Sequence, residues 1–535
     1  MTETSGAVRP RSRERKIRPK HGAWIAAIVT TLVVMVLQRD VGIARDETVY
    51  MAAGDRYAEW WTGLVKWKHG LDGKLIDQTF GGAFGGGGNP EHPPLVKLAS
   101  GLSHRWLSGV LGDPSAYRLP SAILHGILAY LVFVMVLEIW GLAEAVLAWV
   151  CLLLLPRALF HAGLDCFDAP TMTLWFASIY AYWRCLDGRK WPWQAGVVWG
   201  LALATKHTAL LLPFAIALHY AVIAWRAKNW KVHWRVPVAM AVIGPLVLLV
   251  LWPWLWLDPI GHIKGWLQFH SNHVHYNFEY LGTNWNHPRF PWHVALVTTL
   301  FTVPTTTLVA AAIGAGTWIA KLRERTDRAP VLLLVLSAAA SIAPFFLGTT
   351  PIFGAEKHWM PILPTICIAA GVGGIWAARQ LTRIPPRIAY AAVIGSIALA
   401  GASEVMVSHP YALTWYSALA GGSPGGADHG MNRQFWGVAA RGILPELATQ
   451  PPGSVYSHDA SPAWHYYQQY GDLPKGYPDS GPEASGIAAS KYALVIHEKH
   501  FNRHDYMIWK SYGTTQPIFV LRSDGVPIVS LYKRP

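Results

Sequence analysis

The sequence predicts a mainly α-helical membrane protein, a polytopic helical bundle of about 11 spans followed by a small C-terminal external α/β domain. Hydrophobic residues make up 52% of the 535 positions and charged residues only 14%, which is too apolar for one soluble domain. The apolar residues come in long runs, and a helix needs about 20 of them to cross the hydrocarbon of a bilayer. After residue 408 no membrane-length run remains.

The candidate spans are 22–38, 119–139, 141–160, 169–184, 193–205, 207–225, 236–257, 293–320, 329–347, 359–378 and 387–407. The first follows the stretch "RPRSRERKIRPK", in which seven Lys or Arg stand against one Glu. Because no small-residue cleavage pattern follows, we expect a retained span with residues 1–21 as a basic cytoplasmic tail. Residues 22–407 then form the transmembrane domain.

Loop charge gives the orientation. With the amino terminus inside, the inner loops include "RCLDGRKW", "WRAKNWKVHWR", "KLRERTDR" and "ARQLTRIPPR", all basic, as expected for the cytoplasmic side. The outer connections hold Asp46, Glu47, Asp165, Asp168, Glu279 and Glu356. An odd number of spans places residues 408–535 outside the cytoplasm. We attribute the net charge of +14 to this topology and to anionic lipid, and predict no nucleic-acid binding.

The C-terminal region has the pattern of a small α/β domain. "SVYSHD", "KYALVIHE", "PIFVLRS" and "PIVSLYK" are typical of short strands, whereas "GVAARGILPELATQ" and "SPAWHYYQQYG" are typical of helices. The glycine run "GGAFGGGGN" lacks a following GK[ST], so it predicts a flexible loop. The four cysteines show no CxxC pairing and indicate neither a disulfide framework nor a zinc site.

Two pairs of acids stand at the outer ends of spans. Asp46 and Glu47 follow the first span and precede "TVYMAAGDRYAEWW", whose aromatic residues predict an amphipathic helix along the membrane interface. Asp165 and Asp168 lie in the short connection "HAGLDCFDAP". The simplest alternative is that each acid only solvates a loop, but this is less plausible where the connection is short.

Cations also interrupt apolar sequence near the same face. Lys206 and His207 in "GLALATKHTALLLP" lie between two short spans, where ionisable groups are costly unless they pair or line a cavity. The alternative is that Lys206 reaches the lipid head groups. Lys97 lies in "NPEHPPLVKLASG", and Lys357 and His358 lie in "EKHWMPILP".

A long outer loop is rich in histidine: its residues are His262, His270, His273, His275 and His287. The HxxHxH spacing could bind a metal, but no carboxylate partner is evident. We favour aromatic and histidine packing at the interface. No metal site is predicted, and a divalent metal is not required.

Five motifs occur in a specific order: "RDETVY", "HPPLVKLA", "LDCFDAP", "ATKHTALLLP" and "EKHWMPILP". In order and spacing the chain resembles the protein O-mannosyltransferase and lipid A aminoarabinose transferase group, which are glycosyltransferases with the GT-C fold. The similarity covers about residues 22–407, and the Asp-Glu pair of the first outer loop is the group's signature.

The resemblance implies transfer of a sugar from a polyprenyl phosphate to a hydroxyl on the outer face, with inversion. A hydroxyl has a pKa far above 7, so a carboxylate must take its proton during attack, and by position this is Asp46. Glu47 would orient Asp46 or bind the acceptor. Asp168 would position the acceptor or the sugar, and Asp165 is the reserve candidate.

The leaving lipid phosphate needs fixed cations. By the same resemblance Lys206 is the leading candidate, with Lys97, His207, Lys357 and His358 as helpers. Relatives often have an Arg-Tyr pair where this chain has Lys357 and His358, and Lys does not replace Arg in bidentate phosphate contact. We therefore expect the phosphate contacts to be distributed differently here. No nucleotide or other cofactor is needed.

The implied partners are the polyprenyl-phosphate sugar, an acceptor that is a protein, lipid or glycan, and the bilayer. The stretch "YSALAGGSPGGADHGMNRQFWG" is similar to the linker after the last span in bacterial relatives, which implies the bacterial inner (plasma) membrane. The alternative is a transporter or flippase for lipid-linked sugars. Such proteins usually bind near the midplane, between two related halves, whereas here the charges gather at one face. A catalytically silent scaffold is a third alternative.

Overall fold

The computed structural model describes residues 20–82, 88–188, 191–323 and 328–535. Almost all of the expected basic tail, most of the glycine run and parts of two of the expected inner loops lie outside these residues.

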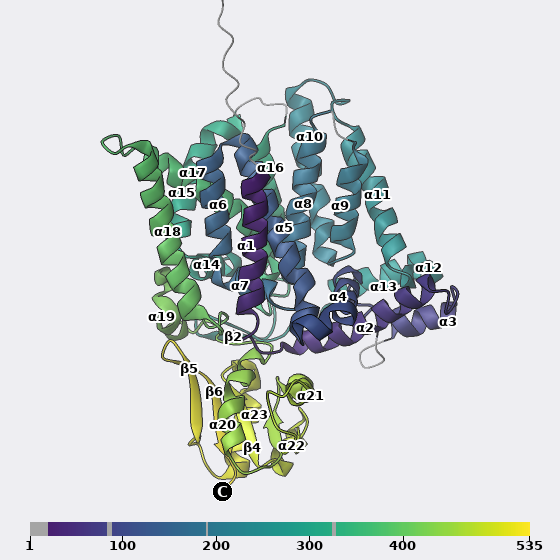
Figure 1. Cartoon of the computed structure of the whole chain (residues 1–535), viewed down its shortest axis with the longest axis vertical. Helices are drawn as coiled ribbons and strands as arrows, with labels where there is room; N and C mark the ends of the chain where they lie inside the picture. Colours follow the sequence, from purple (N-terminus) through teal and green to yellow (C-terminus); the bar gives the residue numbers. More distant parts are fainter. Residues whose placement is uncertain (1–19, 83–87, 189–190, 324–327) are drawn as a thin grey trace, which may run out of the picture.

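The membrane part is a bundle of helices that run side by side (Figure 1). Each of the eleven expected apolar runs coincides with one of them over most of the helix length, which confirms the predicted fold class. The helices are α1 (Lys20–Leu37), α5 (Ser115–Ile139), α6 (Leu142–Leu153), α8 (Asp168–Cys185), α9 (Trp193–Leu203), α10 (Leu212–Arg226), α11 (Arg235–Leu251), α15 (Thr305–Arg323), α16 (Pro330–Ile342), α17 (Leu363–Arg379) and α18 (Pro386–Ser408).

Length and composition identify five segments of the described chain that can cross a membrane alone, and up to seven if each bent pair is one span. The single segments are Ser115–Ile139, His207–Arg226, Pro330–Leu347, Met360–Arg379 and Pro386–Ser408. The pairs are α6 with α7 (Pro156–Ala162), bent by 70°, and α14 (Val294–Thr302) with α15, bent by 119°. Helices α1, α9 and α11 are apolar but shorter. The chain is an integral membrane protein.

Small residues let the central helices approach closely. A Cβ added at Gly373 of α17 would lie only 2.0 Å from the carbonyl oxygen of Ala310 in α15. Close backbone approach of this kind is a main source of helix association in lipid. Accordingly, α17 is 78% buried over its apolar window, whereas the peripheral α18 is 11% buried.

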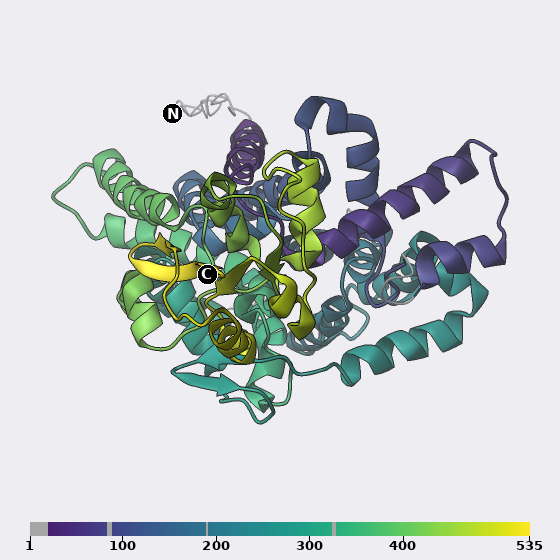
Figure 2. The ribbon, with the colours of Figure 1, turned by 90° about the horizontal axis from the view of Figure 1, so that it is seen from below.

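Amphipathic helices lie across one end of the bundle, nearly perpendicular to it (Figures 1 and 2). They include α2 (Arg45–Val65), the short α3 (Gly73–Ile76) and α13 (Pro259–Ser271), and α2 packs on α4 (Leu95–Leu111). A Cβ at Gly101 would lie 2.0 Å from the carbonyl oxygen of Gly54, so glycine is required where α4 meets α2. The helix expected after Asp46 and Glu47 is therefore α2.

The C-terminal region is an α/β unit that projects from the same end of the bundle (Figure 1). Its sheet has the order β3 (Val455–Ser457), β4 (Tyr492–Ile496), β6 (Val526–Lys533) and β5 (Phe519–Ser523). β3 is parallel to β4, and the other pairs are antiparallel. The helices are α20 (Leu444–Thr449), α21 (Trp464–Gln469), α22 (Ala484–Ala489) and α23 (Asn502–Tyr512). The four strands coincide with the four predicted ones.

The C-terminal unit is joined to the loop that follows α1. The amide of Ile43 donates to the hydroxyl of Tyr467 at 2.9 Å, and the amide of Arg45 donates to the carbonyl of Trp436 at 2.9 Å. The Arg45 guanidinium also pairs with Asp459 at 3.0 Å. The start of α2, where the first two acids lie, is therefore held between the bundle and this unit.

Candidate active site

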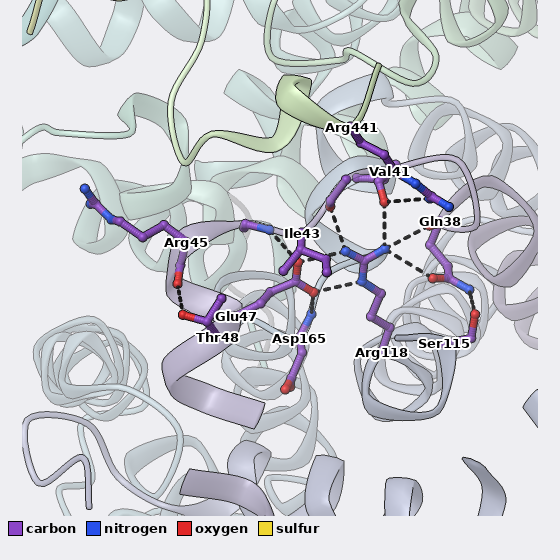
Figure 3. Close-up of polar contacts among 12 residues, drawn as sticks. Gln38, Val41, Ile43, Arg45, Glu47, Thr48, Ser115, Arg118, Asp165 and Arg441 are labelled. Carbon is purple, nitrogen blue, oxygen red and sulfur yellow. Dashed lines mark hydrogen bonds and ion pairs between the residues drawn. The ribbon is translucent and has the colours of Figure 1, made fainter. Parts of the chain in front are cut away.

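A buried ion pair fixes the start of α2 (Figure 3). Two guanidinium nitrogens of Arg118 each donate to one carboxylate oxygen of Glu47 at 2.8 Å, and both side chains are fully buried. Arg118 also donates to the carbonyls of Gln38, Val41 and Gly42, at 2.7 to 3.1 Å. A bidentate pair with its remaining donors satisfied is the geometry in which a buried charge is tolerated.

Glu47 is also a helix cap. It is the third residue of α2, and its side chain accepts from the amide of Ala44 at 2.8 Å, which satisfies a backbone donor left free at the helix start. It accepts from the amide of Asp165 at 2.7 Å as well. All its oxygens are thus engaged within the protein, so in this structure Glu47 organises the loop and has no free edge for a substrate.

Asp165 is likewise enclosed. Its Oδ1 accepts from the hydroxyl of Ser100 at 2.5 Å, and its Oδ2 is buried without a hydrogen-bond partner among the described residues. Burial raises the pKa of Asp165 well above its usual range, with the Glu47 charge adding to the effect. The enclosed Asp165 therefore has no edge open to a substrate.

Asp46 is the exception among the four predicted acids. Its Oδ2 accepts from the indole N–H of Trp436 at 2.8 Å, and its Oδ1 lies 3.8 Å from the guanidinium of Arg45. The Asp46 side chain is 28% exposed, whereas Asp165 and Asp168 are 1% and 3% exposed as residues. Asp46 is therefore the acid of this set that a substrate can reach directly.

Asp168 and Lys206 form a second buried pair. Lys206 Nζ donates to Asp168 Oδ1 at 2.6 Å, with both side chains at least 95% buried. Asp168 is the first residue of α8, where the helix dipole favours a negative charge. Lys206 also lies 5.5 Å from the ring centroid of Phe167.

Lys357 completes the group from η4 (Ala355–His358). Its ammonium lies 4.2 Å from the ring centroid of Trp436 and 4.7 Å from that of Phe353, and no carboxylate lies within ion-pair distance in the described part of the chain. Burial lowers its pKa, although Asp46 and Asp168 act in the opposite direction. The structure thus brings together two predicted acids, Asp46 and Asp168, with two predicted cations.

The other predicted cationic residues lie in different settings. Lys97 Nζ donates to the backbone and side-chain oxygens of Asn89, both at 2.8 Å, and to the carbonyl of His92 at 2.7 Å. Its three protons are used to close the loop before α4. His358 contacts the carbonyl of Phe353 through Nε2 at 2.6 Å.

The histidines of the long outer loop do not converge on one another. His262 stacks on Trp254, with ring centroids 3.8 Å apart, and His273 stacks on Phe353 at 5.1 Å, as the packing interpretation predicts. His270 instead stacks on His207.

Sequence reasoning missed several residues that hold the site. Arg118 is a cation at the start of an apolar run, so the rule that flagged Lys206 could have found it. Trp436 lies 390 positions from Asp46, and no spacing predicts their contact. A further missed pair is Arg157 with Glu356, at 2.9 Å. Burial raises the pKa of Glu356, but Arg157 and His161 together outweigh burial and lower that pKa to about 2.

Comparison with known proteins gives one family match. Residues 91–256 match the family described as dolichyl-phosphate-mannose-protein mannosyltransferase. A comparison with curated proteins finds no match.

Two solved structures share the fold over nearly the whole chain. ArnT from Cupriavidus metallidurans bound to undecaprenyl phosphate is 16% identical, with 95% of this chain and 98% of that chain covered and a TM-score of 0.50. The apo state of the same protein is 14% identical, with coverages of 96% and 98% and a TM-score of 0.50. These matches confirm the resemblance that the five motifs indicate.

Proposed function

We propose that this chain, a glycosyltransferase with the GT-C fold, moves a sugar from a polyprenyl-phosphate donor to an acceptor hydroxyl, with Asp46 as the general base. One observation carries the proposal. Asp46 is the partly exposed acid of the predicted set, while Glu47, Asp165 and Asp168 are buried and engaged with other groups.

We assign the base role to Asp46 because one of its carboxylate oxygens is available to a substrate. A general base must reach the acceptor proton at hydrogen-bond distance. The indole of Trp436 donates to one oxygen of Asp46 and helps to orient the carboxylate. Among the described residues, the only ion-pair contact of the other oxygen is with the Arg45 guanidinium, 3.8 Å away. That oxygen is free to accept the proton as the acceptor oxygen attacks the anomeric carbon.

The cations suit the departing phosphate. As the bond between the anomeric carbon and the phosphate oxygen breaks, its electron pair stays on the phosphate, and fixed positive charge stabilises the product. Lys357 lies among aromatic rings with no carboxylate partner described, and Lys206 can share its charge between Asp168 and a phosphate. Asp168 then holds Lys206 in place, in addition to any contact with the sugar.

Single displacement predicts inversion, because base and leaving group act on opposite sides of the sugar.

The basic loops lie on the cytoplasmic side by the charge rule. We therefore place the reaction at the opposite, extracytoplasmic face, where the C-terminal unit also lies. The matching family is described by dolichyl-phosphate mannose, and the similar ArnT structure holds undecaprenyl phosphate, which supports a polyprenyl-phosphate donor here. The contact between Trp436 and Asp46 supports an acceptor that approaches beside the C-terminal unit.

The test uses the full chain in liposomes with a panel of radiolabelled polyprenyl-phosphate sugars and a native membrane extract as acceptor. We compare wild type, Asp46→Asn and the control Asp40→Asn, an acid six positions earlier whose side chain is 69% exposed. Label should leave the lipid with wild type and Asp40→Asn but not with Asp46→Asn. Label that stays on the lipid but crosses the bilayer equally in all three would instead establish a transporter.

A further inference from the structure

Three histidines from distant parts of the chain meet beside the candidate active site. His92 lies in the loop before α4, His207 begins the turn before α10, and His270 lies near the end of α13. One ring nitrogen from each lies within 4.8 Å of the others. The ring centroids of His207 and His270 are 3.6 Å apart, and those of His92 and His270 are 5.6 Å apart.

Two of these rings have buried nitrogens without a partner. Nδ1 of His92 and Nδ1 of His207 are buried and make no hydrogen bond to any described residue. Buried polar groups are nearly always satisfied, so an unpaired one calls for an absent ligand. Because one nitrogen of each ring lies within 4.8 Å of the others, two unpaired nitrogens within this cluster point to a single shared ligand.

His270 already has the arrangement of a metal ligand. Its Nε2 contacts the carbonyl of Glu91 at 2.9 Å, which requires Nε2 to carry the proton and leaves a lone pair on Nδ1. Metal-bound histidines usually donate their other N–H to a carbonyl or carboxylate in this way.

We propose that His92, His207 and His270 bind one divalent ion of the zinc class. Imidazole ligands suit zinc and its neighbours in the first transition row better than Mg²⁺ or Ca²⁺, which prefer oxygen. Three protein ligands with one open position is the arrangement of zinc sites that contact a substrate.

Binding requires a small change in the rings. Nitrogens at 2.0–2.1 Å from a tetrahedral ion are about 3.3 Å apart, closer than the 4.8 Å limit within which they now lie. The stacked rings of His207 and His270 cannot both point in-plane lone pairs at one ion, so His207 must turn about its terminal torsion, which is soft.

The three histidines lie next to the candidate donor site. The ring of Phe167 packs on His92, with ring centroids 4.4 Å apart, and its centroid also lies 5.5 Å from Lys206 Nζ. Three neutral imidazoles leave the ion with its full double charge, which favours an anionic oxygen as fourth ligand. We infer that this ligand is a phosphate oxygen of the lipid donor, a step that rests on the proposed function.

The test uses full-length protein in nanodiscs, stripped of metal and titrated with Co²⁺, whose visible absorption reports tetrahedral coordination. Wild type should bind one equivalent with a tetrahedral spectrum that Zn²⁺ displaces. His92→Ala, His207→Ala and His270→Ala should each weaken binding at least tenfold, whereas His262→Ala and His273→Ala from the same loop should bind as wild type. X-ray absorption of the zinc-loaded wild type should count three imidazoles, independently of whether the variants fold.

Each part can fail separately. Absence of stoichiometric Co²⁺ binding by wild type, or binding lost in His273→Ala but retained in His92→Ala, would overturn the site. Undecaprenyl phosphate added to the Co²⁺ protein should shift the spectrum; an unchanged spectrum would overturn the phosphate assignment alone. Transfer activity is not needed for any of these readouts, so a failure of the proposed function is distinguished from a failure of the metal site.

Discussion

The indole nitrogen of Trp436 lies 2.8 Å from a carboxylate oxygen of Asp46 and donates a hydrogen bond to it. The two residues belong to different parts of the chain, the loop after the bundle and the first turn of α2. Trp436 also lies under the ammonium of Lys357 at 4.2 Å. One side chain therefore sets the position of both the proposed base and a proposed phosphate cation.

Replacing Trp436 with phenylalanine should lower kcat more than it changes KM. The variant keeps an aromatic ring for Lys357 but loses the donor that orients Asp46, and one hydrogen bond to a charged group is worth roughly 1.5–3 kcal/mol, or a tenfold or greater loss of rate. The measurement is steady-state transfer with the donor identified from the labelled panel, with Trp509→Phe in α23 as control. An unchanged kcat would remove Trp436 from the positioning of Asp46.

Replacing Lys206 should lower both the stability of the protein and its transfer activity. A double variant that also replaces Asp168 should distinguish these two effects. Lys206→Met leaves Asp168 buried and unpaired, which should cost about 3–5 kcal/mol. Lys206→Met with Asp168→Asn removes both charges and should recover most of that stability. If Lys206 also serves the phosphate, transfer stays low in the double variant.

The readouts for this pair are the thermal unfolding midpoint and the rate at which label leaves the lipid. Recovery of transfer together with stability would assign Lys206 a purely structural role.

Substitutions at Glu47 and Asp46 should show that these neighbouring acids have different roles, because Glu47 pairs with Arg118 and Asp46 does not. Glu47→Gln keeps the shape, but its amide nitrogen cannot accept, so at most two of the four hydrogen bonds accepted by the carboxylate remain. It also leaves Arg118 without a counter-charge in a site where both side chains are fully buried, so we expect a loss of at least about 3 kcal/mol. Protein that remains folded should still transfer sugar, unlike Asp46→Asn. Complete loss of transfer in well-folded Glu47→Gln would place Glu47 in the chemistry, and circular dichroism with size-exclusion chromatography checks the folding.

The sequence predicted the helices of the bundle well because the signal is local: each apolar run identifies its own helix. The orientation that the loop charges indicate stays a prediction. The sequence also placed Asp46, Asp168, Lys206 and Lys357 at one face. The contacts among them were not predictable, because partners such as Trp436 are hundreds of positions away.

The histidines illustrate the same limit. The HxxHxH spacing drew attention to a local group, whereas His270 meets His92 and His207 only through the packing of the long loop on the loops before α4 and α10. Local spacing can suggest a ligand set within one helix or loop, but a site assembled from three segments needs the fold.

The C-terminal unit should lose stability as the pH rises, because of Asp505. This side chain in α23 is partly buried, and burial raises its pKa to about 7, whereas an unfolded aspartate titrates near 3.9. The folded unit therefore holds this proton more tightly than the unfolded chain, so its stability is full below about pH 4 and falls as the pH rises through 7.

The pKa difference sets an upper limit of about 4 kcal/mol on this loss of stability, which solvent at the partly exposed carboxylate reduces to on the order of 1–2 kcal/mol. Asp505→Asn has nearly the same shape without the charge. It should match wild type at about pH 3.5, where the aspartate is protonated in both folded and unfolded states, and should exceed wild type in stability at pH 8. The measurement is proteolysis in urea, which follows the fragment beyond residue 408. Equal stability of the two proteins at pH 8 would mean that Asp505 ionises without cost, with its carboxylate in water rather than against the sheet.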